Sequence, residues 1–185
     1  MNLAIESRGA RTRASILRAF AELIFRDGFE NLSVQAMVAH AGIARSTFYE
    51  HFGSKEDVLR ASMEQFFTVL ARCVSVEAEP VSLTDVLAHF WENRRLADAI
   101  FSGMSRRIIA LSLSEMIEAN LHDRPRAELL LPSRLIAIHI AEAQLALVEA
   151  WLRGRAFART GDIAAALYQS SRASAGAMLR KGAAD

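Results

Sequence analysis

The chain has 185 residues, of which 52% are hydrophobic and only three are prolines, and this composition favours a compact helical protein of one or two small domains. Its single cysteine, Cys73, excludes an internal disulfide, and the net charge of +1 does not by itself indicate a nucleic-acid partner. Because the chain does not begin with the basic, apolar and small-residue pattern of a signal peptide, we expect a cytoplasmic protein.

The first helix is predicted over about residues 12–27, where apolar side chains recur at helical spacing. Gly28 should end this helix, because glycine tolerates the backbone conformation found at helix ends. Residues 1–20 carry four arginines against one glutamate. This basic segment is either an arm that contacts DNA ahead of the first helix or a frayed terminus. The predicted buried stripe of the helix consists of Leu17, Phe20, Ala21, Ile24 and Phe25.

Two short helices separated by Gly42 are predicted next. Ser33 is a suitable N-cap for the first of them, and Gly42 stands where that helix must stop. The second helix, about residues 45–51, should turn Phe48 and Phe52 inward and present an outer face that is rich in hydrogen-bond donors. A helix-turn-helix needs this division between a buried seam and an exposed helix that can enter the major groove.

The ordered motif over this segment resembles the DNA-binding domain of the TetR family of bacterial transcriptional repressors. The resemblance covers roughly residues 10–60 and includes an upstream Gly28-Phe29, then Ala41-Gly42-Ile43, Thr47, Tyr49, His51-Phe52 and Ser54-Lys55. Ala44 departs from the pattern, since the family often has Ser or Thr at this position. The lost side-chain cap is typically worth about 1 kcal/mol.

Several side chains of this segment are candidates for direct contact with DNA. Arg45 is the strongest candidate for reading a base edge, because arginine to guanine is the commonest specific contact. Ser46 and Thr47, which follow it on the exposed helix, are further candidates for base contacts. Gln35 is placed to reach adenine or a phosphate, and the Ser33 hydroxyl is placed to face a phosphate at a helix N-terminus.

The resemblance also implies contacts with the DNA backbone. The family residues that match Tyr49, His51 and Lys55 hold phosphates, so these three side chains would set the register on the duplex rather than the sequence. The alternative for Tyr49 is a half-buried aromatic residue. Glu50 should face away from DNA, and we assign it no role.

The rest of the chain is predicted to be helical as well. A long fourth helix begins after the Ser54 cap and connects two domains, and three shorter helices follow up to about Leu121. We expect an all-α protein of about nine helices. The predicted domains are a helix-turn-helix domain in residues 1–55, with the connector helix from about residue 55, and a helical effector-binding and dimerisation domain in residues 56–185.

The last two helices, about residues 133–153 and 162–180, are rich in alanine among larger apolar residues. Small side chains permit close helix approach, so this surface should receive a partner helix. The resemblance implies a four-helix bundle with a second subunit; the alternative is that both helices are buried within one subunit. Glu142 and Glu149 argue against a membrane span in the apolar stretch from Leu135 to Trp151.

The resemblance further implies a small-molecule site among the middle helices. An apolar cavity with few polar groups is the usual form of such a site. The alternative for an aromatic and methionine set at helical spacing is plain core. The candidates for the pocket are Phe67, His89, Phe90, Trp91, Phe101, Met104, Arg107 and Met116.

These observations favour a homodimeric transcriptional repressor that a small-molecule effector releases from a palindromic operator. The alternative is a DNA-bound scaffold that recruits a protein partner without a small-molecule ligand. We do not expect an enzyme, since the sequence has no Ser-His-acid order, Gly-rich phosphate loop or metal-ligand spacing. We also expect neither a cofactor nor a bound metal.

Overall fold

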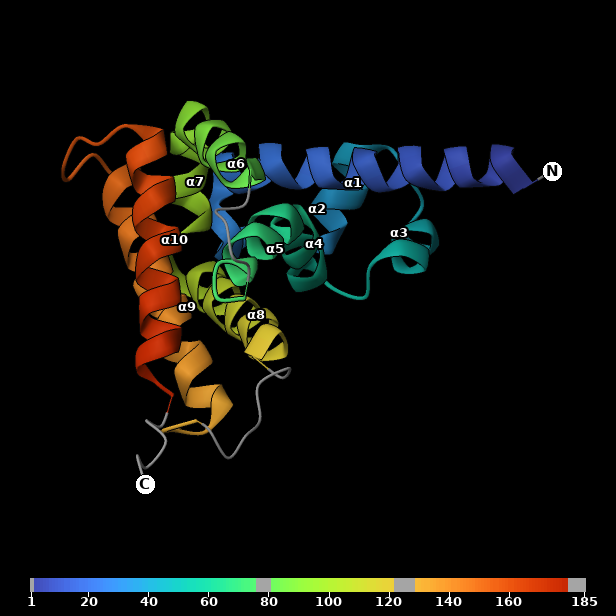
Figure 1. Ribbon diagram of the computed structural model, residues 1–185. Helices are drawn as coiled ribbons and strands as arrows, with labels where there is room; N and C mark the ends of the chain where they lie inside the picture. The colour runs from blue at the N-terminus through green and yellow to red at the C-terminus, as the bar shows by residue number, and fades with distance from the viewer. Residues whose placement is uncertain (1, 76–80, 122–128, 180–185) are drawn as a thin grey trace, which may run out of the picture. The chain divides into compact units, whose positions relative to one another are not determined.

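The computed structural model describes residues 2–75, 81–121 and 129–179 (Figure 1). Across these residues the regular elements are all helices: α1 Asn2–Asn31, α2 Val34–Ala41, α3 Arg45–His51, α4 Lys55–Ser62, α5 Glu64–Arg72, α6 Val81–Glu92, α7 Arg94–Ile100, α8 Gly103–Leu121, α9 Ser133–Leu152 and α10 Thr160–Ala177. Extended pairing in the same residues is limited to an isolated antiparallel bridge between Leu129 and Leu179.

The predicted all-α fold is confirmed, with ten helices in the described residues where about nine were expected. The additional helix arises because the predicted fourth helix is two helices, α4 and α5. They are separated at Met63, whose φ of −104° and ψ of 1° are not helical.

The chain forms two compact units. The first comprises Met1–Met63 and Arg95–Ile108, and the second comprises Glu64–Arg94 and Ile109–Asp185. This division differs from the predicted functional boundary at residue 55, because α4 packs against α1 and therefore belongs with the first unit.

The long helix α1 anchors the first unit by packing against both α2 and α4. Its buried face differs from the predicted stripe. Phe20 and Ile24 are buried as expected, but Phe25 is 57% exposed and Leu23 takes the inward position. α1 also begins at Asn2, so Arg8 and Arg11 lie on the helix itself and not on an arm that precedes it. The exchange of Phe25 for Leu23 has a simple cause: the side on which α2 and α4 pack decides which residues of each helical turn face the core.

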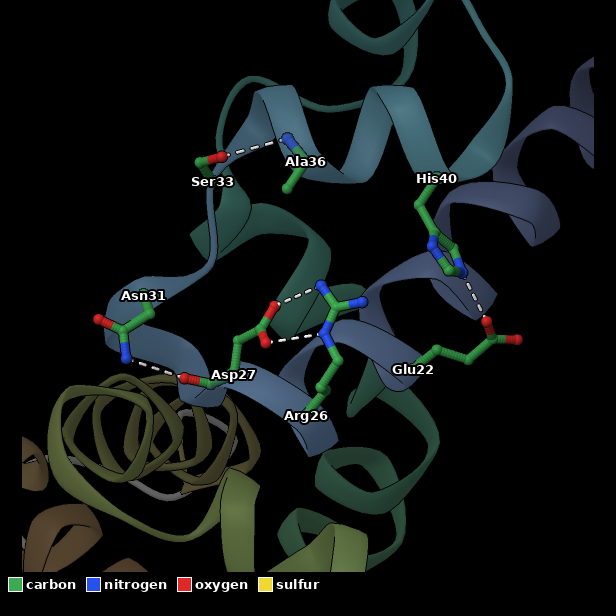
Figure 2. Close-up of polar contacts among 7 residues, drawn as sticks. All are labelled: Glu22, Arg26, Asp27, Asn31, Ser33, Ala36 and His40. Atoms are coloured by element: carbon green, nitrogen blue, oxygen red, sulfur yellow. Dashed lines mark hydrogen bonds and ion pairs between the residues drawn. The ribbon is translucent and has the colours of Figure 1, made fainter.

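Glycine and serine define the helix ends that follow α1. Gly28 has a non-helical backbone with φ of 76°, and Phe29 beyond it is buried. Ser33 caps α2, with its Oγ accepting a hydrogen bond of 3.1 Å from the backbone N–H of Ala36 (Figure 2). Gly42 ends α2 in the left-handed region with φ of 65°. These predicted boundaries are confirmed.

Lys55, the first residue of α4, holds the end of α1 in place. Its Nζ donates hydrogen bonds to the backbone carbonyls of Phe29 at 2.8 Å, Leu32 at 2.9 Å and Glu30 at 3.4 Å. The ammonium also lies 4.6 Å from the centroid of the Phe29 ring. A lysine ammonium has three protons, which matches these three carbonyls at and just beyond the end of α1. The Phe29 carbonyl also accepts a hydrogen bond of 3.3 Å from the backbone N–H of Leu32.

The second unit is built around four packed helices. α10 packs against both α6 and α9, and α5 packs against α6. α9 is long and apolar enough to cross a membrane by length and composition alone, but half of that window is buried inside the protein. Its inward face includes Ile140, Leu145 and Val148, which are all buried. α9 therefore serves as a core helix of this unit.

We predict that Lys55→Met lowers the free energy of unfolding by about 1–3 kcal/mol, because three carbonyls lose a charged donor while the aliphatic stem is kept. Urea denaturation followed by circular dichroism measures the change. Arg60→Met is the matched control on the same helix, since Arg60 forms an exposed pair with Asp57, and it should cost less than about 1 kcal/mol. Equal unfolding midpoints for Lys55→Met and the wild type would contradict the role of Lys55.

Candidate nucleic-acid interface

α3 is held from behind by aromatic side chains. Phe48 is fully buried, Phe52 is nearly so, and their ring centroids are 6.1 Å apart. Met37 of α2 is also fully buried, and α2 packs against α3. Ala44 provides no side-chain cap for α3, as the sequence indicated. A short uncapped helix in this setting is stabilised by packing, and the pair α2–α3 forms the predicted helix-turn-helix.

The outer face of α3 carries the predicted base-contacting residues. Arg45 and Ser46 are exposed and Thr47 is half-buried. Arg45 donates a long hydrogen bond of 3.4 Å from Nη2 to the phenolic oxygen of Tyr49, and its guanidinium carbon lies 5.7 Å from the Tyr49 ring centroid. The structure thus brings Arg45 and Tyr49 together on one exposed surface.

Tyr49 combines a packed ring with an accessible side chain. Its ring meets that of Phe48 at 87° with 5.4 Å between centroids, and 47% of the residue remains exposed. The contact with Phe48 fixes the Tyr49 ring at the surface, where the side chain stays accessible. Glu50, to which no role was assigned, is exposed on the same helix.

The start of α2 contributes two further candidates. Ser33 and Gln35 are both exposed. The Ser33 oxygen accepts the capping hydrogen bond from Ala36, and its hydroxyl proton stays available for donation to another group.

The amino-terminal part of α1 lies beside the end of α3. A Cβ atom placed on Gly9 would be 3.7 Å from Cε1 of His51, and the guanidinium of Arg13 lies 5.5 Å from the Phe52 ring centroid. His51 is half-buried. The basic part of α1 therefore lies beside the carboxyl-terminal end of α3, although it is not an arm that precedes the helix.

Lys55 occupies a different environment from the one expected of a phosphate contact. Its ammonium donates to the carbonyls of Phe29, Glu30 and Leu32, at and just beyond the end of α1. A phosphate contact would have to compete with these bonds, so the structure does not favour the role that the resemblance implied.

Polar side chains on the surface of the first unit form one contact between α1 and α2 and one ion pair within α1 (Figure 2). Nε2 of His40 lies 2.6 Å from Oε2 of Glu22, which links α2 to α1. Arg26 makes two hydrogen bonds, of 2.8 and 2.7 Å, to the carboxylate of Asp27, and these lower the pKa of Asp27. Exposed pairs of this kind contribute little stability each, so the burial of apolar side chains remains the main stabilising contribution.

The residues predicted to line an effector pocket are divided between the two units. Phe101, Met104 and Arg107 belong to the first unit, where Phe101 is buried and the other two are exposed. The second unit holds Phe67, which is buried, Phe90, Trp91 and Met116, which are half-buried, and His89, which is exposed. The exposure of His89, Met104 and Arg107 does not favour an enclosed pocket at these three positions.

Phe90 and Trp91 are engaged in aromatic packing within the second unit. The Phe90 ring lies 4.6 Å from that of Phe66, and Trp91 stacks on Trp151 with 4.8 Å between centroids and 21° between planes. Trp151 also donates a hydrogen bond of 3.1 Å from Nε1 to the carbonyl of Ala158. For these two residues the structure favours the alternative of plain core.

The second unit contains a polar residue that the pocket prediction missed. Gln144 of α9 is 2% exposed, and its Nε2 donates to the carbonyl of Leu70 at 3.0 Å and to Oγ of Ser171 at 2.8 Å. Ser171 in turn donates to the carbonyl of Leu167 at 2.6 Å. Both amide protons of Gln144 are thus used, while its Oε1 is buried with no hydrogen-bond partner in the described part of the chain. A glutamine on the inward face of an apolar helix is the sequence signal that identifies it.

A metal site is not apparent in the residues that the structure covers. Across residues 2–75, 81–121 and 129–179, His, Cys, Asp and Glu side chains do not gather in groups of three that could hold an ion. Cys73 is buried, with its Sγ donating to the carbonyl of Val69 at 3.3 Å.

Comparison with known proteins agrees with this geometry. Residues 16–62 match the family of bacterial regulatory proteins described as the tetR family. The fold is similar to that of a TetR transcriptional regulator from Streptococcus agalactiae 2603V, with 20% sequence identity, a TM-score of 0.60, and coverage of 92% of this chain and 99% of that chain.

Two further solved structures share the fold. NalD, the secondary repressor of the MexAB-OprM multidrug efflux pump in Pseudomonas aeruginosa, has 21% identity and a TM-score of 0.53 over 95% of this chain and 99% of its own. Thermus thermophilus FadR, a TetR family transcriptional repressor in complex with lauroyl-CoA, has 20% identity and a TM-score of 0.51 over 94% and 98%. The matched residues 16–62 include the whole helix-turn-helix, which identifies this part of the chain as a DNA-binding domain of the TetR type.

Proposed function

We propose that the protein is a homodimeric transcriptional repressor that binds a palindromic operator through α3 and is released from it by a small-molecule effector. The observation that carries this proposal is the exposed, donor-rich face of α3, which Phe48 and Phe52 support from the buried side. A helix of this size with exposed polar side chains fits the major groove.

The proposed contacts with DNA are of two kinds: contacts with base edges and contacts with the phosphate backbone. Arg45, Ser46 and Thr47 read base edges. The contact between Arg45 and Tyr49 is long and exposed, so the guanidinium can exchange it for a bidentate pair with guanine at little cost. Gln35 contacts adenine or a phosphate, since it is exposed in the first turn of α2.

Backbone contacts come from three side chains around this surface: Ser33, Tyr49 and His51. Ser33 and Tyr49 offer hydroxyl donors on the exposed face, and His51 offers a ring nitrogen at the end of α3. Arg8 and Arg11 add positive charge from α1 on the His51 side. Lys55 is not included, because its protons are donated to the carbonyls of α1.

We assign DNA binding to α1–α4, which lie in the first unit, and effector binding and dimerisation to the second unit. The DNA-binding part therefore continues past residue 55, since α4 and its Lys55 complete the packing of α1. Dimerisation accounts for two α3 helices, one for each half-site of a palindrome.

The last two helices each have one buried face and one exposed face, which supports a dimer formed through them. On α9 the exposed face includes Leu135, at 52%, and Ile138, and it continues along the helix through Ala143 and Ala146. On α10 the exposed positions at helical spacing are Ala166, Gln169, Ser170, Ala173 and Ala177. Small residues interspersed with exposed leucine and isoleucine allow the helices of a second subunit to approach closely.

The unpartnered Oε1 of Gln144 supports an effector that carries a hydrogen-bond donor. A buried acceptor without a partner costs about 1–3 kcal/mol, and a ligand hydroxyl or N–H would remove this cost. Apart from Gln144 itself and a few serines, the buried side chains described in the second unit are apolar. A small, mostly apolar molecule with one hydroxyl or N–H group matches this chemistry.

The alternative function, a scaffold that recruits a protein partner, has one supporting observation. Phe157, in the segment between α9 and α10, is 87% exposed. A large apolar side chain at this exposure fits a contact with another protein. Such a scaffold would bind DNA in the same way but would not respond to small molecules.

Arg45→Ala should weaken binding to the preferred duplex by about 1–3 kcal/mol and relax base preference at one position, because one bidentate contact is lost. Duplexes selected from a random pool, followed by anisotropy titrations on single-base variants of the consensus, measure both effects. Glu50→Ala is the control on the same helix and should not change base preference. An equal loss of affinity for every duplex would instead indicate that Arg45 contacts phosphates.

Light scattering at micromolar concentration should give twice the 20.4 kDa mass of one chain. Ala146→Arg should reduce this mass to that of a single chain, because a long charged side chain cannot fit into a close helix interface. Ala39→Arg changes an exposed alanine of α2 in the same way and should remain a dimer. A wild-type mass of one chain would refute the dimer.

Phenol should raise the unfolding temperature more than toluene, which has the same ring without the hydroxyl donor, because ligand binding stabilises the folded state. Gln144→Leu should abolish this difference while leaving the Leu70 carbonyl paired with the N–H of Cys73 at 3.1 Å. Gln169→Leu, at an exposed position of α10, is the control and should retain the difference. If phenol and toluene act alike on the wild type, Gln144 does not anchor a donor, and the scaffold is favoured.

A further inference from the structure

A carboxylate from the end of α1 caps the first turn of α8. Oε1 of Glu30 accepts a hydrogen bond of 2.8 Å from the backbone N–H of Met104. Both residues belong to the first unit. The first N–H groups of a helix have no acceptor within the helix, and a negative charge at that end is favoured by the helix dipole. Glu30 therefore supplies the partner that the first turn of α8 needs.

Gly103, the first residue of α8, makes room for this contact. Its φ of +49° lies in the left-handed region. A Cβ atom at this position would collide with the Glu30 carboxylate oxygen. A side chain here would thus strain the backbone and displace Glu30 at the same time.

The same turn of α1 is held by Lys55. Its ammonium donates to the carbonyls of Phe29 and Leu32 on either side of Glu30, and to that of Glu30 itself. The hydrogen bond from Met104, with the Glu30 backbone N–H and the Lys55 charge as smaller causes, keeps the pKa of Glu30 below its usual value. The carboxylate is consequently ionised at neutral pH.

This junction lies directly before the proposed DNA-contacting residues of α2. Leu32, whose carbonyl Lys55 holds, is followed by Ser33, the cap of α2. In the other direction, α8 continues from Gly103 to Leu121 as one helix and includes buried Leu113 and Ile117. A displacement of the start of α8 would therefore act on the turn that sets the position of α2.

We propose that Glu30 is a positioning residue that couples α8 to the DNA-binding helices. The contact between Glu30 and Met104 is closed in the conformer that binds DNA, and a ligand that shifts the start of α8 opens it. This inference rests on the proposed DNA-binding function. When the contact is closed, the turn before α2 is already ordered and loses less conformational entropy on DNA binding. A closed contact therefore raises the affinity for DNA. By reciprocity, DNA must favour the closed contact by the same factor.

Selective labelling with ¹⁵N-methionine tests this reciprocity on the full chain, since there are only six methionines. The Met104 amide, assigned by its loss in Met104→Leu, should exchange with solvent about twofold to fivefold more slowly when a selected DNA duplex is bound. Met116, in the interior of α8, provides the internal reference. An unchanged Met104 exchange rate on a wild-type protein that binds the duplex would overturn the coupling.

Variants separate coupling from a purely structural role. Glu30→Ala should weaken DNA binding about twofold to fivefold and abolish the DNA-dependent slowing at Met104. Glu30→Gln, which keeps an acceptor without the charge, should lie between Glu30→Ala and the wild type. Gly103→Ala should also abolish the DNA-dependent slowing at Met104, and it should weaken DNA binding at least as much as Glu30→Ala, because it displaces Glu30 and strains the backbone as well.

Glu22→Ala is the matched control, since Glu22 is an α1 carboxylate that pairs with His40 and not with α8. It should retain the DNA-dependent slowing at Met104. Loss of the slowing in Glu22→Ala, or unchanged DNA affinity in Glu30→Ala, contradicts the coupling alone. Failure of the wild type to bind any selected duplex contradicts the proposed function as well, so the two failures are distinguishable.

Discussion

The burial of Phe48 and Phe52 behind a seven-residue helix is the constraint on which the rest of the molecule depends. A helix of this length is not stable by itself, and Ala44 gives it no side-chain cap. The helical conformation of α3 is therefore stabilised by the packing of its inner face. This leaves Arg45 and the exposed part of Tyr49 on the outer face, where they are available to recognise another molecule.

Polar contacts at the end of α1 complement this apolar packing. Gly28 breaks the helix. Beyond the break, Lys55 donates to backbone carbonyls, and Glu30 accepts a hydrogen bond from the first turn of α8. The lysine and the glutamate have opposite roles because the end of one helix exposes carbonyls and the start of another exposes N–H groups. Two ordinary surface charges become part of the framework that places α2.

The second unit follows a different principle. Its helices bury mainly leucine, isoleucine and phenylalanine. A few polar residues are buried with them, and among these Gln144 has a side-chain oxygen without a partner in the described residues. Its nitrogen is fixed by Leu70 and Ser171, so the orientation of the amide is determined by the protein. An oriented acceptor in an apolar surrounding is suited to recognise a donor, because desolvation strengthens such a contact.

The amino-acid sequence by itself determined the features that depend on neighbouring residues. Helix spacing, the Ser33 and Ser54 caps and the stop at Gly42 were all predicted, because each rests on contacts within a few residues. The tertiary structure decided the rest: the inward turn of Leu23 in place of Phe25, the use of Lys55 as an internal donor, and the pairing of Glu30 with Met104. These contacts join residues up to 74 positions apart, and periodicity along one helix carries no information about which distant backbone group a side chain will meet.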